Sequence, residues 1–100
     1  MTDSEREISH VCDSIKTMLL SKNMHYGDSA LNPIRCFSNA TPIEQLLVRI
    51  DDKINRIRQG SGYFGDDEDV INDLVGYLIL LRIALDRDYA ASYNTNDSES

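Results

Sequence analysis

The amino-acid sequence predicts an all-α fold, with a three-helix core, a long ordered loop between the first two helices, and oligomerisation through the third. Apolar residues recur at spacings of three and four in three separate segments, as they do on helices that bury one face. Glycine and proline fall mainly between these segments, where they interrupt helices. One hundred residues correspond to one domain. We therefore expect residues 1–92 to form a single helical domain and residues 93–100 a disordered polar tail.

The first helix is predicted to run from about Ser4 to Lys22. Ser4 and Glu7 have the spacing of a capping box, which would satisfy two amides at the start of the helix. Its apolar residues repeat at helical spacing on one side, so it should pack along that side only; they are Ile8, Val11, Cys12, Ile15, Met18 and Leu19. Cys12 is therefore expected to be a small core residue.

The connection from Asn23 to Ala40 has no helical periodicity. It contains Gly27 and Pro33 together with many side chains that form hydrogen bonds. At roughly 18 residues it is longer than most connections in a compact domain, and long structured loops are often functional. We expect this loop to be ordered against the helices.

The second helix has the clearest start in the chain. Thr41 can cap it, Pro42 suits its first position, and Glu44 can close a capping box. Its core-facing residues lie within an arc of about 100°, namely Ile43, Leu46, Leu47, Ile50, Ile54 and Ile57. Gly60 is predicted to end the helix, and Ser61 to Gly65 to form a tight turn that makes the next helix antiparallel.

The third helix is predicted to start near Asp66 or Asp67 and to run to about Asp88. Its apolar residues nearly encircle it, from Val70 to Leu85, and a helix of this kind is buried on more than one face. Two other helices and a loop are too few to cover it within a small monomer. We therefore expect a homo-oligomer, dimer-based and with two-fold symmetry, that has this helix at its interface.

Charge and composition narrow the classes of partner. The net charge of −7 argues against nucleic acid as the main partner, because proteins that bind a phosphate backbone usually carry a basic field. A local group of arginine and lysine residues can still hold one small anion. The N-terminus lacks the features of a signal peptide, and no apolar run reaches the ~20 residues of a membrane span. The two cysteines, Cys12 and Cys36, suit a reduced compartment, so we expect a cytoplasmic protein without membrane contact.

Three aspartates on the last two helices are candidate ligands for Mg²⁺: Asp52, Asp69 and Asp73. Asp73 lies in a strongly apolar stretch, and a carboxylate held away from water is costly unless it meets a cation, a metal or hydrogen-bond donors. One interpretation is an ion pair between Asp73 and an arginine of the second helix; the other is a site for a divalent metal or a nucleotide. Gly76 and Leu80 share the stripe of Asp73, and Tyr77 lies beside it. Gly76 would allow close approach of another helix or of a ligand.

The second helix brings Arg49, Lys53 and Arg56 together around Asp52. Arg49 and Arg56 are three residues before and four residues after this carboxylate, so both can reach it. Such an array leaves guanidinium donors for a phosphate, or it is a solvated surface network of little energetic value. We treat the three cations as candidate phosphate contacts.

The loop after the first helix supplies the remaining candidates: Lys22, Asn23, Tyr26 and Gly27, with Tyr77 of the third helix. An amide, an aromatic face and a flexible glycine suit contacts with a base or a sugar. The sequence Tyr-Gly-Asp is also typical of a turn, because Gly and Asp favour turn conformations. No arrangement of serine, cysteine and histidine points to nucleophilic catalysis, and no phosphate-binding glycine motif is present.

Three segments, in this order and spacing, resemble the nucleotide modification associated domain 1 family; they are residues 22–29, 47–56 and 68–77. The resemblance covers residues 22 to about 81. The family is small and helical and is frequent in phages, and the resemblance implies a role in nucleotide metabolism or base modification inside a bacterial or phage-infected cell.

The chain is also distantly similar to the MazG-like all-α nucleotide pyrophosphohydrolases, which hold magnesium with carboxylates on facing helices. Residues 73–78, Asp-Leu-Val-Gly-Tyr-Leu, resemble the end of their second acidic motif. Val70 stands where that family has an acidic residue, with Asp69 one position earlier, and the paired glutamates of the preceding helix are absent. The resemblance implies nucleotide binding and leaves magnesium-dependent hydrolysis open.

These observations lead to one principal hypothesis and two alternatives. The principal hypothesis is a nucleotide-handling protein, in which a water bound to Mg²⁺ would attack phosphorus if the protein is an enzyme. The first alternative is a phage protein that binds or sequesters a nucleotide-derived signal without catalysis. The second is an oligomeric module that binds another protein through its acidic surface.

Overall fold

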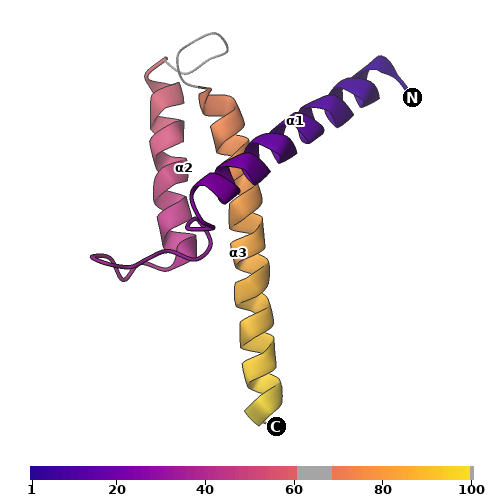
Figure 1. Ribbon diagram of the computed structural model, residues 1–100. Helices are drawn as coiled ribbons and strands as arrows, with labels where there is room; N and C mark the ends of the chain where they lie inside the picture. The colour runs from indigo at the N-terminus through magenta and orange to yellow at the C-terminus, as the bar shows by residue number, and fades with distance from the viewer. Residues whose placement is uncertain (61–68, 100) are drawn as a thin grey trace.

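The structure is a computed structural model that describes residues 1–60 and 69–99, with residues 94–99 described by their backbone alone. Over these ranges it contains three helices and no strand: α1 (Asp3–His25), α2 (Pro42–Arg58) and α3 (Val70–Glu99). The prediction of an all-α protein is therefore confirmed. Figure 1 shows α2 beside α3 and α1 crossing α3 at an angle.

The cap of α1 differs from the prediction. Thr2 has an extended backbone, and its hydroxyl accepts a hydrogen bond from the amide of Glu5 at 3.1 Å, so the cap is Thr2 and not Ser4. Thr2 and Glu5 have the same capping-box spacing as Ser4 and Glu7, and the earlier pair lies where the helix begins. At its other end α1 continues past Lys22 to His25, and Gly27 follows with a positive φ of 61°.

The limits of α2 agree with the prediction. The hydroxyl of Thr41 accepts a hydrogen bond from the amide of Glu44 at 3.2 Å, and Pro42 occupies the first helical position. Gln59 caps the C-terminus, and Gly60 takes a φ of 82°, the left-handed conformation that ends many helices. The predicted tight turn from Ser61 to Gly65 lies outside the described residues.

The limits of α3 differ from the prediction at both ends. Residues Asp66 and Asp67 lie outside the described residues, and the helix starts at Val70, after Asp69. Asp69 accepts a hydrogen bond from the amide of Asn72 at 3.1 Å, as a capping residue does. The helical backbone continues beyond Asp88 to Glu99, because residues 89–99 contain no glycine or proline that would end it. The disorder of residues 93–100 stays a prediction.

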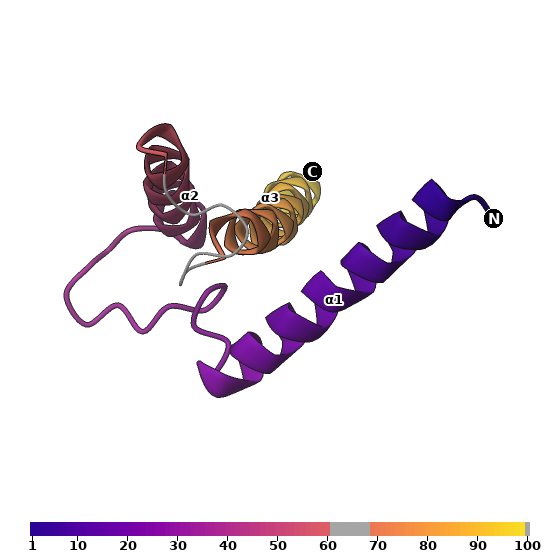
Figure 2. The same cartoon turned by 90° about the horizontal axis from the view of Figure 1, so that it is seen from above.

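The core lies between α2 and α3. Leu46 and Ile50 of α2 pack there with Val70 and Ala84 of α3, and all four are buried. Of the described residues in α1, Ile15 alone is buried, because only the C-terminal half of this helix lies against α3. In Figure 2 the N-terminal half of α1 extends away from the other two helices. Cys12 lies on this extension and is exposed, so its expected place in the core was wrong.

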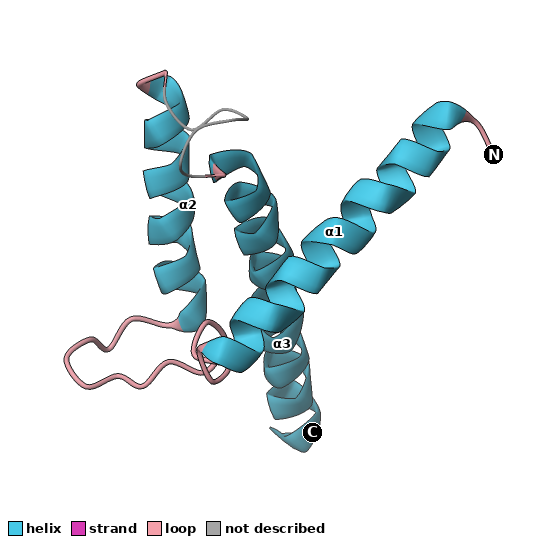
Figure 3. Ribbon diagram, turned by 45° about the horizontal axis from the view of Figure 1, so that its top comes forward, coloured by secondary structure: helices cyan, strands magenta, loops and turns pink. Residues whose placement is uncertain are grey.

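Two further features affect the surface. Figure 3 shows the connection from α1 to α2 swinging out to one side of the helices, and its side chains Ile34 and Phe37 are exposed. Several large apolar side chains of α3 are exposed as well, among them Leu78, Ile79, Ile83 and Leu85. Within the described ranges, no helix combines the length and the hydropathy needed to cross a lipid bilayer.

Candidate functional site

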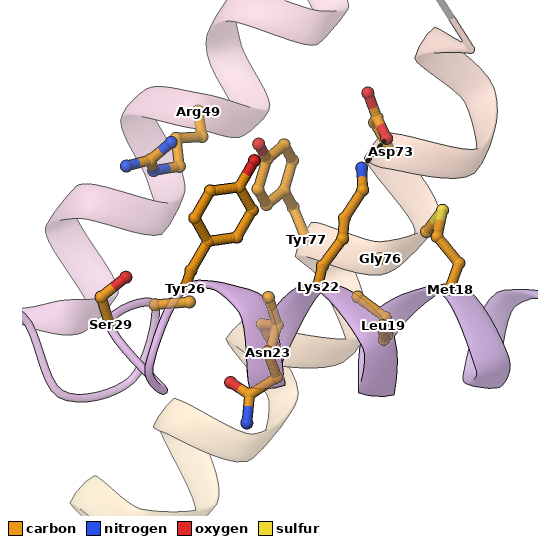
Figure 4. A pocket seen from close by; sticks show the side chains of 12 residues that line it. Met18, Leu19, Lys22, Asn23, Tyr26, Ser29, Arg49, Asp73, Gly76 and Tyr77 are labelled. Atoms are coloured by element: carbon orange, nitrogen blue, oxygen red, sulfur yellow. Dashed lines mark hydrogen bonds and ion pairs between the residues drawn. The ribbon is translucent and has the colours of Figure 1, made fainter.

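A cavity lies where the C-terminal half of α1 and the loop after it meet α2 and α3. Its volume is about 320 Å³, at the lower end of the range for small-molecule sites. Figure 4 shows side chains from all three helices around it. The lining residues are Met18, Leu19, Lys22, Asn23, Tyr26, Ser29, Ala30, Arg49, Asp73, Gly76, Tyr77 and Leu80.

Asp73 of α3 is held between two lysines. Its Oδ1 accepts a hydrogen bond from Nζ of Lys22 at 2.9 Å, and its Oδ2 lies 3.5 Å from Nζ of Lys53. The side chains of Asp73 and Lys53 are 18% and 11% exposed, whereas that of Lys22 is 51% exposed. Asp73 therefore pairs with a cation of α2, as one interpretation expected, although that cation is a lysine and a second lysine from α1 joins it. The inner amine neutralises a mostly buried carboxylate, and the outer amine is accessible from the cavity.

Arg49 contributes a guanidinium to the other side of the cavity. It is exposed, and among the described residues it forms no ion pair. A guanidinium presents donors in a planar fork that suits a phosphate or a carboxylate. Arg49 is therefore the cation of this site with the most donors available to a ligand.

Two tyrosines supply aromatic surface. In Figure 4 the ring of Tyr26, the residue after α1, and the ring of Tyr77 of α3 both reach the cavity, with the Tyr26 hydroxyl directed towards Tyr77. Tyr26 caps the end of α1, and the next two residues, Gly27 and Asp28, have φ values of 61° and 63°. These left-handed residues turn the chain back, so that Ser29 also reaches the cavity. The segment Tyr-Gly-Asp therefore forms a turn and also contributes to the lining of the cavity, so both interpretations of it apply.

The apolar side of the cavity depends on the approach of α1 to α3 at Gly76. A Cβ atom added at Gly76 would lie 3.0 Å from Cδ2 of Leu19 and 3.4 Å from Cε of Met18. The absence of a side chain at this position allows the two helices to lie this close, as the sequence indicated. Leu80 follows one turn later on α3 and also lines the cavity.

The charges around the cavity differ in sign from those of the chain as a whole. Lys22 and Arg49 line it together with Asp73, and Lys53 lies behind that carboxylate. These four groups carry three positive charges and one negative charge, in a chain of net charge −7. The local excess of positive charge favours an anionic ligand.

Most of the predicted ligand-binding residues line the cavity, and the others lie outside it. Five of the eight line the cavity: Lys22, Asn23, Tyr26, Arg49 and Tyr77. In Figure 4 the amide of Asn23 points away from Arg49 and Tyr77. Lys53 contacts Asp73 instead of lining the cavity, and Gly27 shapes the turn. Arg56 lies 3.7 Å from Asp52 in a pair whose side chains are 45% and 60% exposed.

The three aspartates predicted to hold Mg²⁺ have three different roles in the structure. Asp69 caps α3, and its second oxygen accepts a hydrogen bond from the side-chain amide of Asn72 at 2.7 Å. Asp52 faces solvent on α2, and Asp73 is bound by lysines. Among the side chains that the structure describes, those of residues 1–60 and 69–93, no three of His, Cys, Asp or Glu are placed to hold one metal ion. The magnesium site stays a prediction.

Six lining residues were missing from the predicted site: Met18, Leu19, Ser29, Ala30, Gly76 and Leu80. The sequence had placed Gly76 and Leu80 only on the stripe of Asp73, and Ser29 only in the segment 22–29. Met18 and Leu19 precede Lys22 by four and three residues, so they share its side of the helix. Their position on the apolar stripe suggested core packing alone. Ala30 offered no chemical signal in the sequence.

No protein-family model, curated protein or solved structure matches the chain. The geometry and charge of the cavity are therefore the basis on which a function can be proposed.

Proposed function

We propose that this protein binds a nucleotide or a nucleotide-derived small molecule in the cavity between its three helices. The observation that carries the proposal is the joint presence of a guanidinium that forms no ion pair with the described residues, an accessible lysine and two tyrosine rings around one cavity. Phosphate and base are the two parts of a nucleotide that such groups recognise. The net charge of −7 fits a small anionic ligand better than a nucleic acid.

Arg49 and Lys22 would bind the phosphate. Arg49 can donate two parallel hydrogen bonds to phosphate oxygens, and the half-exposed amine of Lys22 can turn from Asp73 towards the same anion. Lys53 keeps Asp73 neutralised when Lys22 turns away, because it lies on the other carboxylate oxygen. The phosphate would therefore lie between α1 and α2, which carry these two cations.

Tyr26 and Tyr77 would bind the base or the sugar. Their rings offer flat apolar surface, and Ser29, which lines the same cavity, offers a hydroxyl. The long loop after α1 contributes Ser29 and Ala30, so its predicted order against the helices is part of this proposal.

The geometry favours binding without turnover over magnesium-dependent pyrophosphate hydrolysis. Hydrolysis of that type needs several carboxylates around the metal. Asp73 meets two ammonium groups instead, which repel a divalent cation, and Asp69 and Asp52 are engaged elsewhere. A pyrophosphohydrolase that holds Mg²⁺ with these three aspartates remains the second proposal, supported by the resemblance alone.

The proposal retains two further predictions from the sequence. One is a homo-oligomer through the third helix, which the exposed apolar side chains of α3 support. The other is a cytoplasmic location in a bacterial or phage-infected cell, as the resemblance implies.

Thermal melting with a panel of nucleoside mono-, di- and triphosphates and cyclic nucleotides tests the proposal. We expect at least one ligand to raise Tm, and calorimetry to show that Arg49→Gln weakens its binding by about 10- to 100-fold, the cost of a hydrogen bond to a charged group. Arg56→Gln is the matched control, because it removes the same charge from the same helix outside the cavity.

Equal weakening by both substitutions would mean that net charge, not the cavity, attracts the ligand. If no nucleotide raises Tm, binding of a protein partner becomes the better hypothesis. Mass spectrometry after incubation with Mg²⁺ separates the two nucleotide proposals: recovery of intact ligand supports binding, and release of pyrophosphate supports hydrolysis.

A further inference from the structure

The chain exposes more surface than a compact protein of its size. Its accessible surface is 7807 Å², whereas a compact monomer of 11.3 kDa exposes about 5,700 Å². Its radius of gyration is 16.5 Å, against about 13 Å for a compact chain of 100 residues. The surplus of roughly 2,000 Å² exceeds the ~800 Å² that each partner buries in an interface of standard size.

Part of this surplus lies on the N-terminal half of α1. Ile8 and Val11 are 63% and 50% exposed, and Cys12 beside them is exposed too. They belong to the same side of the helix as Ile15 and Leu19, which lie against α3. Together with Ser4 and Glu7 they line a shallow hollow. The apolar side of α1 therefore continues beyond the helix that it packs on, as Figure 2 shows for the helix as a whole.

The surface of α3 that receives α1 continues beyond the contact in the same way. Gly76 and Leu80 lie at the contact with α1, and Ile79 and Ile83 follow on the same side of α3. These two isoleucines are 40% and 36% exposed. Each of the two helices thus has an apolar side that is longer than their mutual contact.

The spacing of these overhanging residues fits a second helix. Ile83 lies seven residues after Gly76, and Cys12 lies seven residues before Leu19. Seven residues of helix span about 10 Å, which is the distance between the axes of two packed helices. The uncovered surface of α3 therefore has room for one additional helix beside α1. The uncovered surface of α1 likewise has room for one additional helix beside α3.

We propose that a second copy of this chain covers both surfaces in a two-fold dimer. In this dimer, α1 packs on its own α3 with its C-terminal half and on the α3 of the second copy with its N-terminal half. Ile8, Val11 and Cys12 then lie against Ile79 and Ile83 of the second copy, and the symmetry repeats the contact. The interface is independent of the nucleotide cavity, because Lys22, Tyr26 and Arg49 take no part in it.

Light scattering coupled to gel filtration tests the proposal on the full chain at about 10 µM and above, since dimerisation depends on concentration. The expected mass is twice 11.3 kDa. Val11→Glu and Ile83→Glu should each give a monomer that remains helical by circular dichroism. Val48→Glu is the matched control: Val48 is 67% exposed on α2, outside both surfaces, so this variant should remain a dimer.

Two further measurements keep the proposal testable if a variant fails to fold. Both cysteines are exposed in the single chain, so in the native dimer Cys12 should react with a thiol reagent about tenfold more slowly than Cys36. Val11→Lys and Ile83→Glu, each monomeric alone, should form a mixed dimer when combined, because the introduced charges attract. A monomeric native chain, equal reactivity of the two cysteines, or a mixture that stays monomeric would overturn the proposal.

Discussion

The pair of helices α2 and α3 and the single helix α1 differ sharply in how firmly they are held. The pair buries Leu46, Ile50, Val70 and Ala84 between its members, whereas α1 buries Ile15 alone among its described residues. Because buried apolar area is the main source of stability, the pair holds most of the folding free energy. The free energy needed to shift or detach α1 is therefore far below the free energy of unfolding the chain.

The cavity lies across the boundary between these two regions. The pair supplies Arg49, Asp73 and Tyr77, and α1 with its loop supplies Lys22 and Tyr26. A ligand that contacts both sides would therefore link the weakly held helix to the firmly held pair. Four sets of substitutions test this contrast.

The largest effect is expected from truncation of the same residue type in the two regions. Leu46→Ala should lower the free energy of unfolding by about 2–5 kcal/mol, because Leu46 is 1% exposed. Leu20→Ala on α1 should change it by less than about 0.5 kcal/mol, because Leu20 is 64% exposed. Urea denaturation followed by circular dichroism measures both. Similar losses for the two variants would show that Leu20 is buried in solution and would contradict the exposure of this side of α1.

The next effect concerns the ion pairs that join α1 to the pair. Asp73→Asn removes the shared partner of Lys22 and leaves Lys53 mostly buried without this carboxylate, at a cost of about 2 kcal/mol. Asp52→Asn removes an exposed pair with Arg56 and should cost less than about 0.5 kcal/mol. Urea midpoints of both variants provide the comparison. If the two losses are equal, Asp73 has no special role in holding the helices together.

A smaller effect separates the two helix caps. Thr41→Ala should cost about 1 kcal/mol, since α2 cannot fray at its start without disturbing the core. Thr2→Ala removes a hydrogen bond of nearly the same length, yet it should leave the unfolding midpoint unchanged within about 0.3 kcal/mol, because the start of α1 packs on nothing in the single chain. Thermal melts of both variants at a concentration that keeps the chain monomeric would measure this contrast, and a large loss from Thr2→Ala would contradict it.

The smallest net effect is expected at Gly76. Alanine improves helix propensity there by about 1 kcal/mol, and the crowding against Leu19 opposes this gain, so the sum should be near zero. Gly27→Ala should instead cost about 1 kcal/mol, because Gly27 has a φ of 61° although no atom crowds it. Calorimetry with a bound nucleotide should show weaker binding in the Gly76 variant, since α1 must move away. Unchanged binding would show that the approach of α1 does not shape the cavity.

Much of this arrangement could be predicted from the sequence, and the limits have physical causes. Helical periodicity and the cap at Thr41 were sufficient for the fold class and for α2. Two overlapping capping boxes at the N-terminus had equal spacing, so the sequence did not distinguish Thr2 from Ser4. Periodicity showed which side of α1 is apolar, but not where α3 stops covering it, and this explains the wrong placement of Cys12.

The site was predicted in part for the same reason. The strings around Tyr26, Arg49 and Asp73 contained most of the groups that meet in the cavity. The roles of individual charges were harder to assign, because a lysine on a helix face looks the same whether it faces a ligand or a buried carboxylate. Lys53 was assigned to phosphate and lies against Asp73, and Asp69 was assigned to metal and caps α3.

The two lysines on Asp73 have a consequence for ligand choice. When Lys22 turns to an incoming anion, one oxygen of Asp73 loses its donor and needs a replacement. A molecule that brings a hydroxyl or amino group along with its negative charge can satisfy that oxygen, whereas sulfate, which carries no proton at neutral pH, cannot. The cavity should therefore select ligands that replace Lys22 as a hydrogen-bond donor to Asp73, and should bind weakly any anion that has no proton to donate.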